Sequence, residues 1–291
     1  MKFITYIDGN KEIPGIMSED LDSVHALSDA GIHSPDMIHF IESRTDADMA
    51  KLKELSKKSG KALSSVKLLA PIPRPHHNIF CLGLNYMDHV AESKNIADAE
   101  KVDEERPSAI YFSKYVTNAV GPDGEIDSHQ DILKNIDYEA ELGVVIGKRA
   151  KKVKENPWDY VFGLVAFNDV SGRDLQFRHG QWFFGKSLDD FTAFGPWIVT
   201  MDEFELPLNL QVQCRVNGET RQNNNTSNMI FPVEHIIPEL SAGLTLEPGV
   251  IIATGTPSGV GMAMNPPACM KPGDICEIDI EGCGVLRNVI K

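Results

Sequence analysis

The sequence contains few basic residues relative to acidic ones. Its 291 residues include 28 Lys and Arg against 42 Asp and Glu, which gives a formal net charge of −14. Nucleic acids and anionic membranes attract proteins through a basic face, so we expect neither as a partner. No apolar run approaches the length of a membrane span, and Asp8 follows the start too closely for a signal peptide.

Cysteine is also scarce, and its spacing excludes two kinds of site. The five cysteines are odd in number and show no C-x-x-C spacing, so neither a disulfide framework nor a zinc site is indicated. They are Cys81, Cys214, Cys269, Cys276 and Cys283. Together with the missing signal peptide, this predicts a cytoplasmic protein.

Residues 1–70 differ in texture from the rest of the chain. After a strand-like start, Ser34-Pro35 is a typical helix opening, and a second helical stretch runs from about Asp46 to Lys58, with Gly60 in the stop position. Prolines at 71, 73 and 75 then mark a stiff linker. We therefore predict a small N-terminal α/β domain over residues 1–70 and a main domain over residues 71–291.

The main domain is predicted to be rich in strands. Expected strands are Ile79–Leu82, Glu139–Ile146, Tyr160–Asn168, Trp197–Thr200, Leu210–Val216, Val250–Ala253, Ile275–Ile280 and Val285–Val289. The stretch near Val233–Ala242 is the best helix candidate. This pattern predicts an α+β fold, mainly β, with a mixed sheet. The charged segment Glu92–Arg106 fits either a solvated helix or a mobile flap.

Glu139 and Glu141 are the most informative pair of residues. They precede apolar Val144–Ile146 on one expected strand, where residues two apart share a face. Two neighbouring carboxylates repel each other unless a cation offsets both, and oxygen ligands favour Mg²⁺, Mn²⁺ or Ca²⁺. The alternative is a solvated edge strand with two surface glutamates.

His89 and Glu92 form a second candidate pair. In a helical turn they stand at i and i+3, where their side chains can touch. A carboxylate fixes the tautomer of an imidazole and raises its basicity, which suits a general base. The alternative is a surface histidine with an incidental glutamate.

Asp169 and Arg173 follow an apolar strand, where binding groups often gather. Asp169 can supply a third carboxylate to a cation site, and Arg173 can hold a substrate carboxylate. An Asx turn at Asn168 or Asp169 is the simpler alternative.

The string Gly180–Ser187 matches the G-x-x-x-x-G-K-[ST] pattern of a phosphate-binding loop. No apolar strand precedes it, little helical periodicity follows it, and three aromatic residues occupy its centre. We therefore reject an ATPase or GTPase interpretation. Lys186 remains a candidate for stabilising an oxyanion. The Gly/Thr loop around Thr256 follows an expected strand and can cradle a carboxylate.

Taken in order, these motifs resemble the fumarylacetoacetate hydrolase family over residues 71–291. The matching motifs are Gly83-Leu84-Asn85-Tyr86 with His89 and Glu92, Asp137–Leu142, Asn168–Ser171 with Arg173, Asp174 and Gln176, Trp182 with Gly185–Ser187 and Asp189, Gly195-Pro196-Trp197, and Thr254–Pro257. The chain departs from the pattern at Tyr115, where many relatives have proline, and at Val250, where Asp is usual.

The resemblance implies a mixed β-sandwich roll and a homodimer. It implies Mg²⁺ or Mn²⁺ on Glu139, Glu141 and Asp169, with Ca²⁺ able to replace them in crystals. It also implies a lid at about residues 85–106 that carries the catalytic pair His89 and Glu92. Lys186 would lie near the substrate oxygen, and the implied substrate contacts are Asn85, Tyr86, Arg173, Gln176 and Thr256.

The function expected from these motifs is a metal-dependent hydrolase. It would cleave a C–C bond in a small 2-oxo or 1,3-dioxo acid, of the acylpyruvate or fumarylpyruvate type, through a metal-stabilised enolate. An oxaloacetate decarboxylase or a 5-carboxymethyl-2-hydroxymuconate-type isomerase on the same metal site is the alternative. A non-catalytic metal-binding protein fits less well, because the catalytic set is complete.

Overall fold

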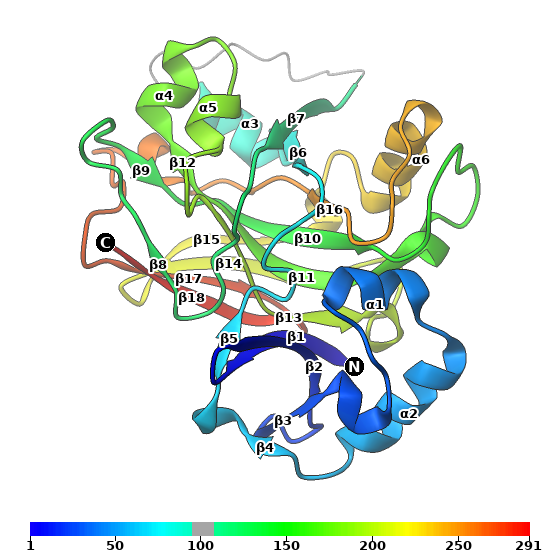
Figure 1. Cartoon of the computed structure of the whole chain (residues 1–291). Helices are drawn as coiled ribbons and strands as arrows, with labels where there is room; N and C mark the ends of the chain where they lie inside the picture. Colours follow the sequence, from blue (N-terminus) through cyan, green and yellow to red (C-terminus); the bar gives the residue numbers. More distant parts are fainter. Residues whose placement is uncertain (95–107) are drawn as a thin grey trace.

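Two β-sheets that pack face to face form the body of the protein (Figure 1). The computed structural model describes residues 1–94 and 108–291. The larger sheet has the order β4 (Lys61–Ala62), β3 (Ser23–Ala26), β2 (Lys11–Met17), β1 (Lys2–Asp8), β13 (Thr192–Thr200), β11 (Val161–Asp169), β10 (Ala140–Ile146), β16 (Ile251–Ala253), β6 (Ile79–Gly83) and β7 (Ile110–Lys114), with β5 (Lys67–Leu69) paired to β1. The smaller sheet has the order β15 (Glu219–Asn225), β14 (Gln211–Val216), β17 (Ile275–Ile280), β18 (Gly284–Ile290) and β8 (Glu125–Ile126).

Short helices pack around these sheets. They are α1 (Met37–Ser43), α2 (Asp46–Ser56), α3 (Met87–Ser93), α4 (Arg173–Arg178), α5 (Phe183–Lys186) and α6 (Val233–Gly243). In Figure 1, α3, α4 and α5 gather at the top, beside the two-stranded sheet of β9 (Ile136–Asp137) and β12 (Ser171–Gly172). None of the described helices is long and apolar enough to cross a membrane. The mainly-β mixed fold expected from the sequence is confirmed.

Strand β10 separates the two main cores by the alternation of its side chains. Leu142, Val144 and Ile146 lie in the core that also contains residues of the smaller sheet. Val145 belongs to the core on the opposite side of the larger sheet. Because side chains alternate along a strand, Glu141 shares the side of Val145 and points away from the sandwich interior.

Residues 1–70 continue the larger sheet. Strand β1 pairs antiparallel with β13, with Lys2 opposite Val199. The ring of Phe3 lies 5.3 Å from that of Phe40 on α1 and 5.0 Å from that of Phe162 on β11, measured between centroids. The aromatic contact therefore joins the first 70 residues to the main sheet, and the boundary at residue 70 stays a prediction.

Three local boundaries differ from those expected. The first helix begins at Met37, after an Asp36 cap whose side chain accepts from the backbone N–H of His39, so Ser34-Pro35 is not its start. The second ends at Ser56, earlier than expected, although its Thr45–Asp48 capping box is complete. Strand β13 starts five residues before the expected Trp197. Most of the expected flap lies outside the described residues, and its first part is α3.

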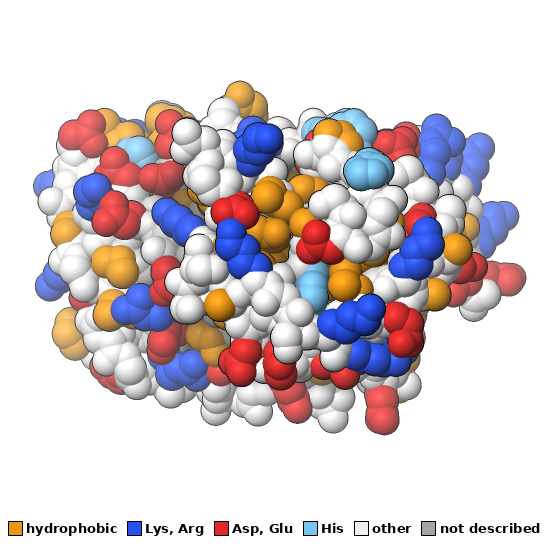
Figure 2. Space-filling view, turned by 60° about the horizontal axis from the view of Figure 1, so that its bottom comes forward, with side chains coloured by type: hydrophobic (Ala, Val, Ile, Leu, Met, Phe, Trp, Pro, Cys, Tyr) orange, Lys and Arg blue, Asp and Glu red, His pale blue; other side chains and the backbone are white. Residues whose placement is uncertain are grey.

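Charges of both signs are interspersed over the face that Figure 2 turns towards the viewer. This is the side on which residues 1–70 lie. On this face the acidic side chains therefore do not form one continuous negative patch, because basic side chains lie between them.

We expect Phe40→Ala to lower the free energy of unfolding by about 3–5 kcal/mol, because it removes a fully buried ring from the contact between α1 and the main sheet. Chemical denaturation measures the change. Phe184→Ala is the matched control, since that ring is 46% exposed and its loss should change stability little. Equal effects of the two substitutions would show that α1 does not depend on this packing.

Candidate metal and substrate site

Three carboxylates converge at the place where β10 begins and β11 ends. Register places Ala140 opposite Asn168, and the backbone N–H of Asp169 donates to the carbonyl of Glu139 at 3.0 Å. Ligand oxygens of Glu139, Glu141 and Asp169 all lie within 4.8 Å of one another. Alternation on β10 brings the two glutamates together, and cross-strand register adds the aspartate.

All three carboxylates are buried, and cations hold two of them. Lys186 Nζ donates to Glu139 at 2.6 Å and to Asp169 at 2.8 Å. Arg173 Nη1 donates to Glu139 at 2.7 Å, and Lys114 Nζ donates to the other oxygen of Asp169. Burial raises the pKa of Glu139, but the charges of Lys186 and Arg173 outweigh it and hold that pKa at about 2.

Glu141 is the carboxylate that lacks a cation. One of its oxygens accepts from the backbone N–H of Gly255 at 2.8 Å, and the other is buried without a partner in the described part of the chain. Burial and the negative charges of Asp169 and Glu139 raise the pKa of Glu141 well above its ordinary value. An unpartnered oxygen facing two further carboxylates fits a hard divalent cation such as Mg²⁺ or Mn²⁺.

A second group of possible metal ligands consists of Asp36, His39 and His76. Both histidines are exposed, and Asp36 already caps α1 and hydrogen-bonds His39. This group resembles an ordinary helix cap more than a buried ion site.

His89 and Glu92 touch across the helical turn expected from their spacing. His89 Nδ1 lies 2.6 Å from Glu92 Oε1, and Glu92 Oε2 accepts from the backbone N–H of Gly259 at 2.8 Å. A carboxylate at Nδ1 places the proton there and leaves Nε2 as the acceptor. His89 is 7% exposed and lines the pocket described next.

A small pocket of about 50 Å³ opens beside the acidic group. Its wall includes Leu82, Gly83, Leu84, His89, Ser93, Phe112, Glu139, Arg173, Gln176, Phe177, Trp182, Lys186 and Thr256. Trp182 closes one side by resting on Gly83, where a Cβ atom would lie 2.1 Å from the indole. Since a water molecule needs about 10–15 Å³ by this measure, the pocket suits a compact ligand.

Arg173 is held so that one end remains available. Its Nε donates to Asp137 at 2.9 Å, and its Nη1 donates to Glu139 and to Gln176. Its Nη2 is buried with no partner among the described residues. A guanidinium in the wall of a pocket with one unused nitrogen can receive a carboxylate.

The remaining expected substrate contacts divide into two kinds. Thr256 and Gln176 lie in the pocket wall. Asn85 does not, because its side chain is used by the backbone of Phe231 and Thr254 at 2.7 to 3.0 Å. Tyr86 is fully buried and does not line the pocket. Its hydroxyl has no hydrogen-bond partner among the described residues. Asn85 is therefore placed to support the loops that surround the site.

Sequence reasoning missed Lys114 and Asp137. Lys114 is fully buried and reaches Asp169 and the carbonyl of Val170, although the departure at Tyr115 drew attention only to its neighbour. Its signal was a single lysine at the end of the apolar run Ile110–Ser113. The signal for Asp137 was the same two-residue spacing that joins Glu139 and Glu141.

The phosphate-loop string has a different role in the structure. Lys186 ends α5 instead of opening a helix, and its ammonium lies between Glu139 and Asp169. A Cβ atom at Gly185 would lie 2.4 Å from the backbone nitrogen of Gln176, so this glycine permits α5 to pack against α4.

The chain was compared with known proteins. Residues 78–291 match the family described as fumarylacetoacetate (FAA) hydrolase C-terminal. Over 230 residues, which are 79% of this chain and 74% of the relative, the sequence is 46% identical to oxaloacetate tautomerase YisK of Bacillus subtilis.

Two solved structures share the whole fold. Fumarylacetoacetate hydrolase from Exiguobacterium antarcticum is 36% identical, with a TM-score of 0.83 and coverage of 100% of this chain and 99% of that one. Maleylpyruvate hydrolase from Sphingobium sp. SYK-6, solved with manganese(II) and pyruvate, is 26% identical, with a TM-score of 0.78 and coverage of 100% and 98%. The homodimer and the cytoplasmic location stay predictions. The sequence match and the shared fold together show that the chain belongs to the fumarylacetoacetate hydrolase family.

Proposed function

We propose that the protein is a divalent-metal-dependent enzyme that moves a proton at the carbon beside the oxo group of a small 2-oxo acid, with oxaloacetate as the leading substrate. One observation carries the proposal: His89 and Lys186 line the same small pocket as Glu139, a member of the acidic group. The 46% identity to an oxaloacetate tautomerase supports the choice of acid. It favours the isomerase and decarboxylase alternative over the C–C hydrolase expected first.

The ion would be Mg²⁺ or Mn²⁺ on Glu139, Glu141 and Asp169. It would polarise the 2-oxo group as a Lewis acid when bound. Lys114 and Lys186 hold the two oxygens of Asp169, and Gly255 fixes one oxygen of Glu141. These contacts keep the carboxylates oriented before any ion arrives.

The chain's own residues would then move the proton. His89 Nε2 takes a proton from carbon 3 of the acid, and the electron pair shifts to the 2-oxo oxygen. Lys186 Nζ stabilises the negative charge on that oxygen by donating a hydrogen bond. The proton on His89 is delivered to the oxygen to give the enol, and the reverse sequence returns the keto acid. Arg173 Nη2 binds a carboxylate of the substrate during both steps.

Hydrolysis of an acylpyruvate is the second candidate. Here His89 would deprotonate water for attack on the distal carbonyl, and Lys186 would again hold the departing enolate. The shared fold with a maleylpyruvate hydrolase whose structure contains pyruvate supports this possibility. The two reactions use the same base but differ in what the base deprotonates.

Removal of the ion should abolish turnover while the fold persists. We expect Glu141→Gln to weaken Mn²⁺ binding by more than about 10–100-fold, since a ligand matters at least as much as an outer partner. The ion-free variant should unfold no more easily than the parent, because the substitution removes a buried charge without a cation partner. Calorimetric titration and thermal unfolding in chelator measure the two effects. Exposed Glu125→Gln is the control, and unchanged Mn²⁺ affinity in the Glu141 variant would contradict the assignment.

Lys186→Met keeps the apolar stem and removes the ammonium. We expect turnover to fall by about 10²–10³, the usual loss when one oxyanion partner is removed. Mn²⁺ binding should persist, because Lys186 contributes no ligand. Steady-state kinetics with titration of Mn²⁺ separates these outcomes, with exposed Lys271→Met as control. A normal rate would leave Lys186 with a purely structural role.

His89→Ala distinguishes proton transfer from decarboxylation. We expect enol–keto interconversion of oxaloacetate, followed by the ultraviolet absorbance of the enol, to fall by about 10²–10⁴. Hydrolysis of an acylpyruvate should fall similarly. Release of CO₂ from oxaloacetate should suffer less, because that step needs an electron sink and no base.

All three rates are measured on one preparation at saturating Mg²⁺, with exposed His33→Ala as control. A parallel loss of all three would mean that His89 binds substrate or closes the site, and the proposed base role would be wrong.

A further inference from the structure

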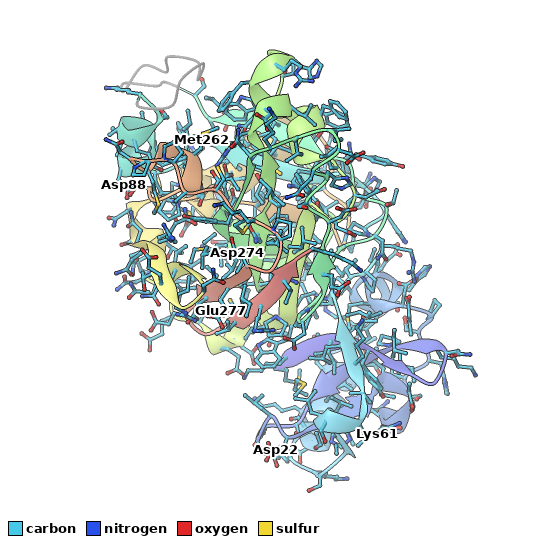
Figure 3. The ribbon with its side chains drawn as sticks, turned by 90° about the vertical axis from the view of Figure 1, so that its left-hand side faces the viewer. Asp22, Lys61, Asp88, Met262, Asp274 and Glu277 are labelled. Atoms are coloured by element: carbon cyan, nitrogen blue, oxygen red, sulfur yellow. The ribbon has the colours of Figure 1, made fainter. Side chains whose placement is uncertain are left out.

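The segment Ser258–Met262 touches α3 and Asp137, two parts of the site that share no hydrogen bond among the described residues. At one end it meets α3: the hydroxyl of Ser258 donates to Asp88 at 2.7 Å, and the backbone N–H of Gly259 donates to Glu92 at 2.8 Å. In Figure 3, Met262 and Asp88 both lie at the end of the molecule opposite Asp22 and Lys61. The partner of the His89 imidazole is therefore held by this segment.

At its other end the segment meets Asp137. The backbone N–H groups of Gly261 and Met262 donate to the two oxygens of Asp137 at 2.8 and 2.9 Å. One of these oxygens also accepts from Arg173 Nε, and the other accepts from the backbone N–H of Tyr138. Asp137 is fully buried and holds four donors, so it has no freedom to rotate.

A third contact fixes the middle of the segment. The hydroxyl of Tyr138, next to Asp137 in the chain, donates to the carbonyl of Gly259 at 3.0 Å. The segment has no room for side chains at its glycines. A Cβ atom at Gly259 would lie 2.1 Å from the carbonyl oxygen of Arg221, and one at Gly261 would lie 2.7 Å from Asp137. The segment can therefore shift only together with its neighbours.

We propose that Asp137 and the segment Ser258–Met262 form a relay that couples the orientation of Arg173 to the docking of α3. Asp137 is the positioning residue of this relay: it aims the unused Nη2 of Arg173 at the pocket and fixes the backbone that receives Glu92. A carboxylate on Arg173 then favours the arrangement in which Glu92 orients His89. Coupling of this kind is reciprocal, so docking of α3 also favours anion binding at Arg173.

Hydrogen–deuterium exchange of the Mn²⁺-loaded enzyme tests the relay without any substrate. In Asp137→Asn, exchange of the backbone amides of α3 should rise by about fivefold or more, the low end of typical coupling. Asp137 makes no hydrogen bond to α3 among the described residues, whereas the segment contacts both, so the segment is the proposed route of the change. Asp174→Asn is the matched control, because Asp174 also accepts from three donors on a neighbouring loop but does not contact the segment.

Tyr138→Phe provides a milder second variant if Asp137→Asn does not fold. It removes only the hydroxyl that holds Gly259, and the same rise in α3 exchange is expected. In the reverse direction, Glu92→Ala should raise exchange at Gly261 and Met262. Unchanged α3 exchange in the variant or variants that fold would overturn the relay, and so would a rise of the same size in Asp174→Asn.

Kinetics adds a readout that rests on the proposed function. Asp137→Asn should raise KM through Arg173 and lower kcat through Glu92. In a Glu92→Ala background it should still raise KM but change kcat by less than about twofold, because the hydrogen bond from Gly259 to Glu92 is already lost. If Asp137→Asn lowered kcat by the same factor with and without Glu92→Ala, the two residues would act independently, and the coupling would be contradicted. If exchange shows the relay but no 2-oxo acid is turned over, the proposed function fails and the relay stands.

Discussion

The site depends on the burial of more negative than positive charge. Counted as ionised, four carboxylates face three cations around the ends of β10 and β11, which leaves one negative charge in excess. The carboxylates are Asp137, Glu139, Glu141 and Asp169, and the cations are Lys114, Arg173 and Lys186. Burial of unpaired charge is costly, and the excess falls on Glu141, whose pKa burial and the neighbouring carboxylates raise well above its ordinary value. A divalent ion reverses the sign of the cluster, and an anionic substrate is then attracted to it.

The fold lowers the free-energy cost of this concentration of charge by separating it from the apolar core between the two sheets. Leu142 and Val144 of β10 enter the interior between the sheets, while Glu139 and Glu141 share the side of Val145, away from that interior. The larger sheet also brings Lys114 of edge strand β7 into contact with Asp169 of β11, although three strands, β10, β16 and β6, lie between β11 and β7 in the order of the sheet. A flat sheet would hold these strands far apart, so its curvature is part of the site.

Sequence spacing predicted the side-chain pairs that lie within one strand or helix. The contacts between different strands depend on strand register, which the sequence did not reveal. The two-residue period placed Glu139 and Glu141 together, and the helical period placed His89 beside Glu92. Lys114 could not be assigned in this way, because its partner is 55 residues away on a strand that does not pair with β7. Asn85 was predicted to contact substrate from the family pattern, yet its amide serves the backbone of Phe231 and Thr254. A sequence motif identifies such a residue but does not show whether its side chain faces the substrate or hydrogen-bonds the backbone of a neighbouring loop.

The geometry of the pocket bears on which reaction the shared machinery performs. Hydrolysis must place water, the bulk of an acyl group and the 2-oxo acid together, whereas tautomerisation needs only the acid. His89, Lys186 and Trp182 line one pocket, so the aromatic wall bounds the space beside the base and the ammonium. The contact of Trp182 with Gly83 fixes the position of this wall, because the indole rests where any side chain at position 83 would lie. Which of the two proposed reactions occurs therefore depends on what fits between this wall and His89.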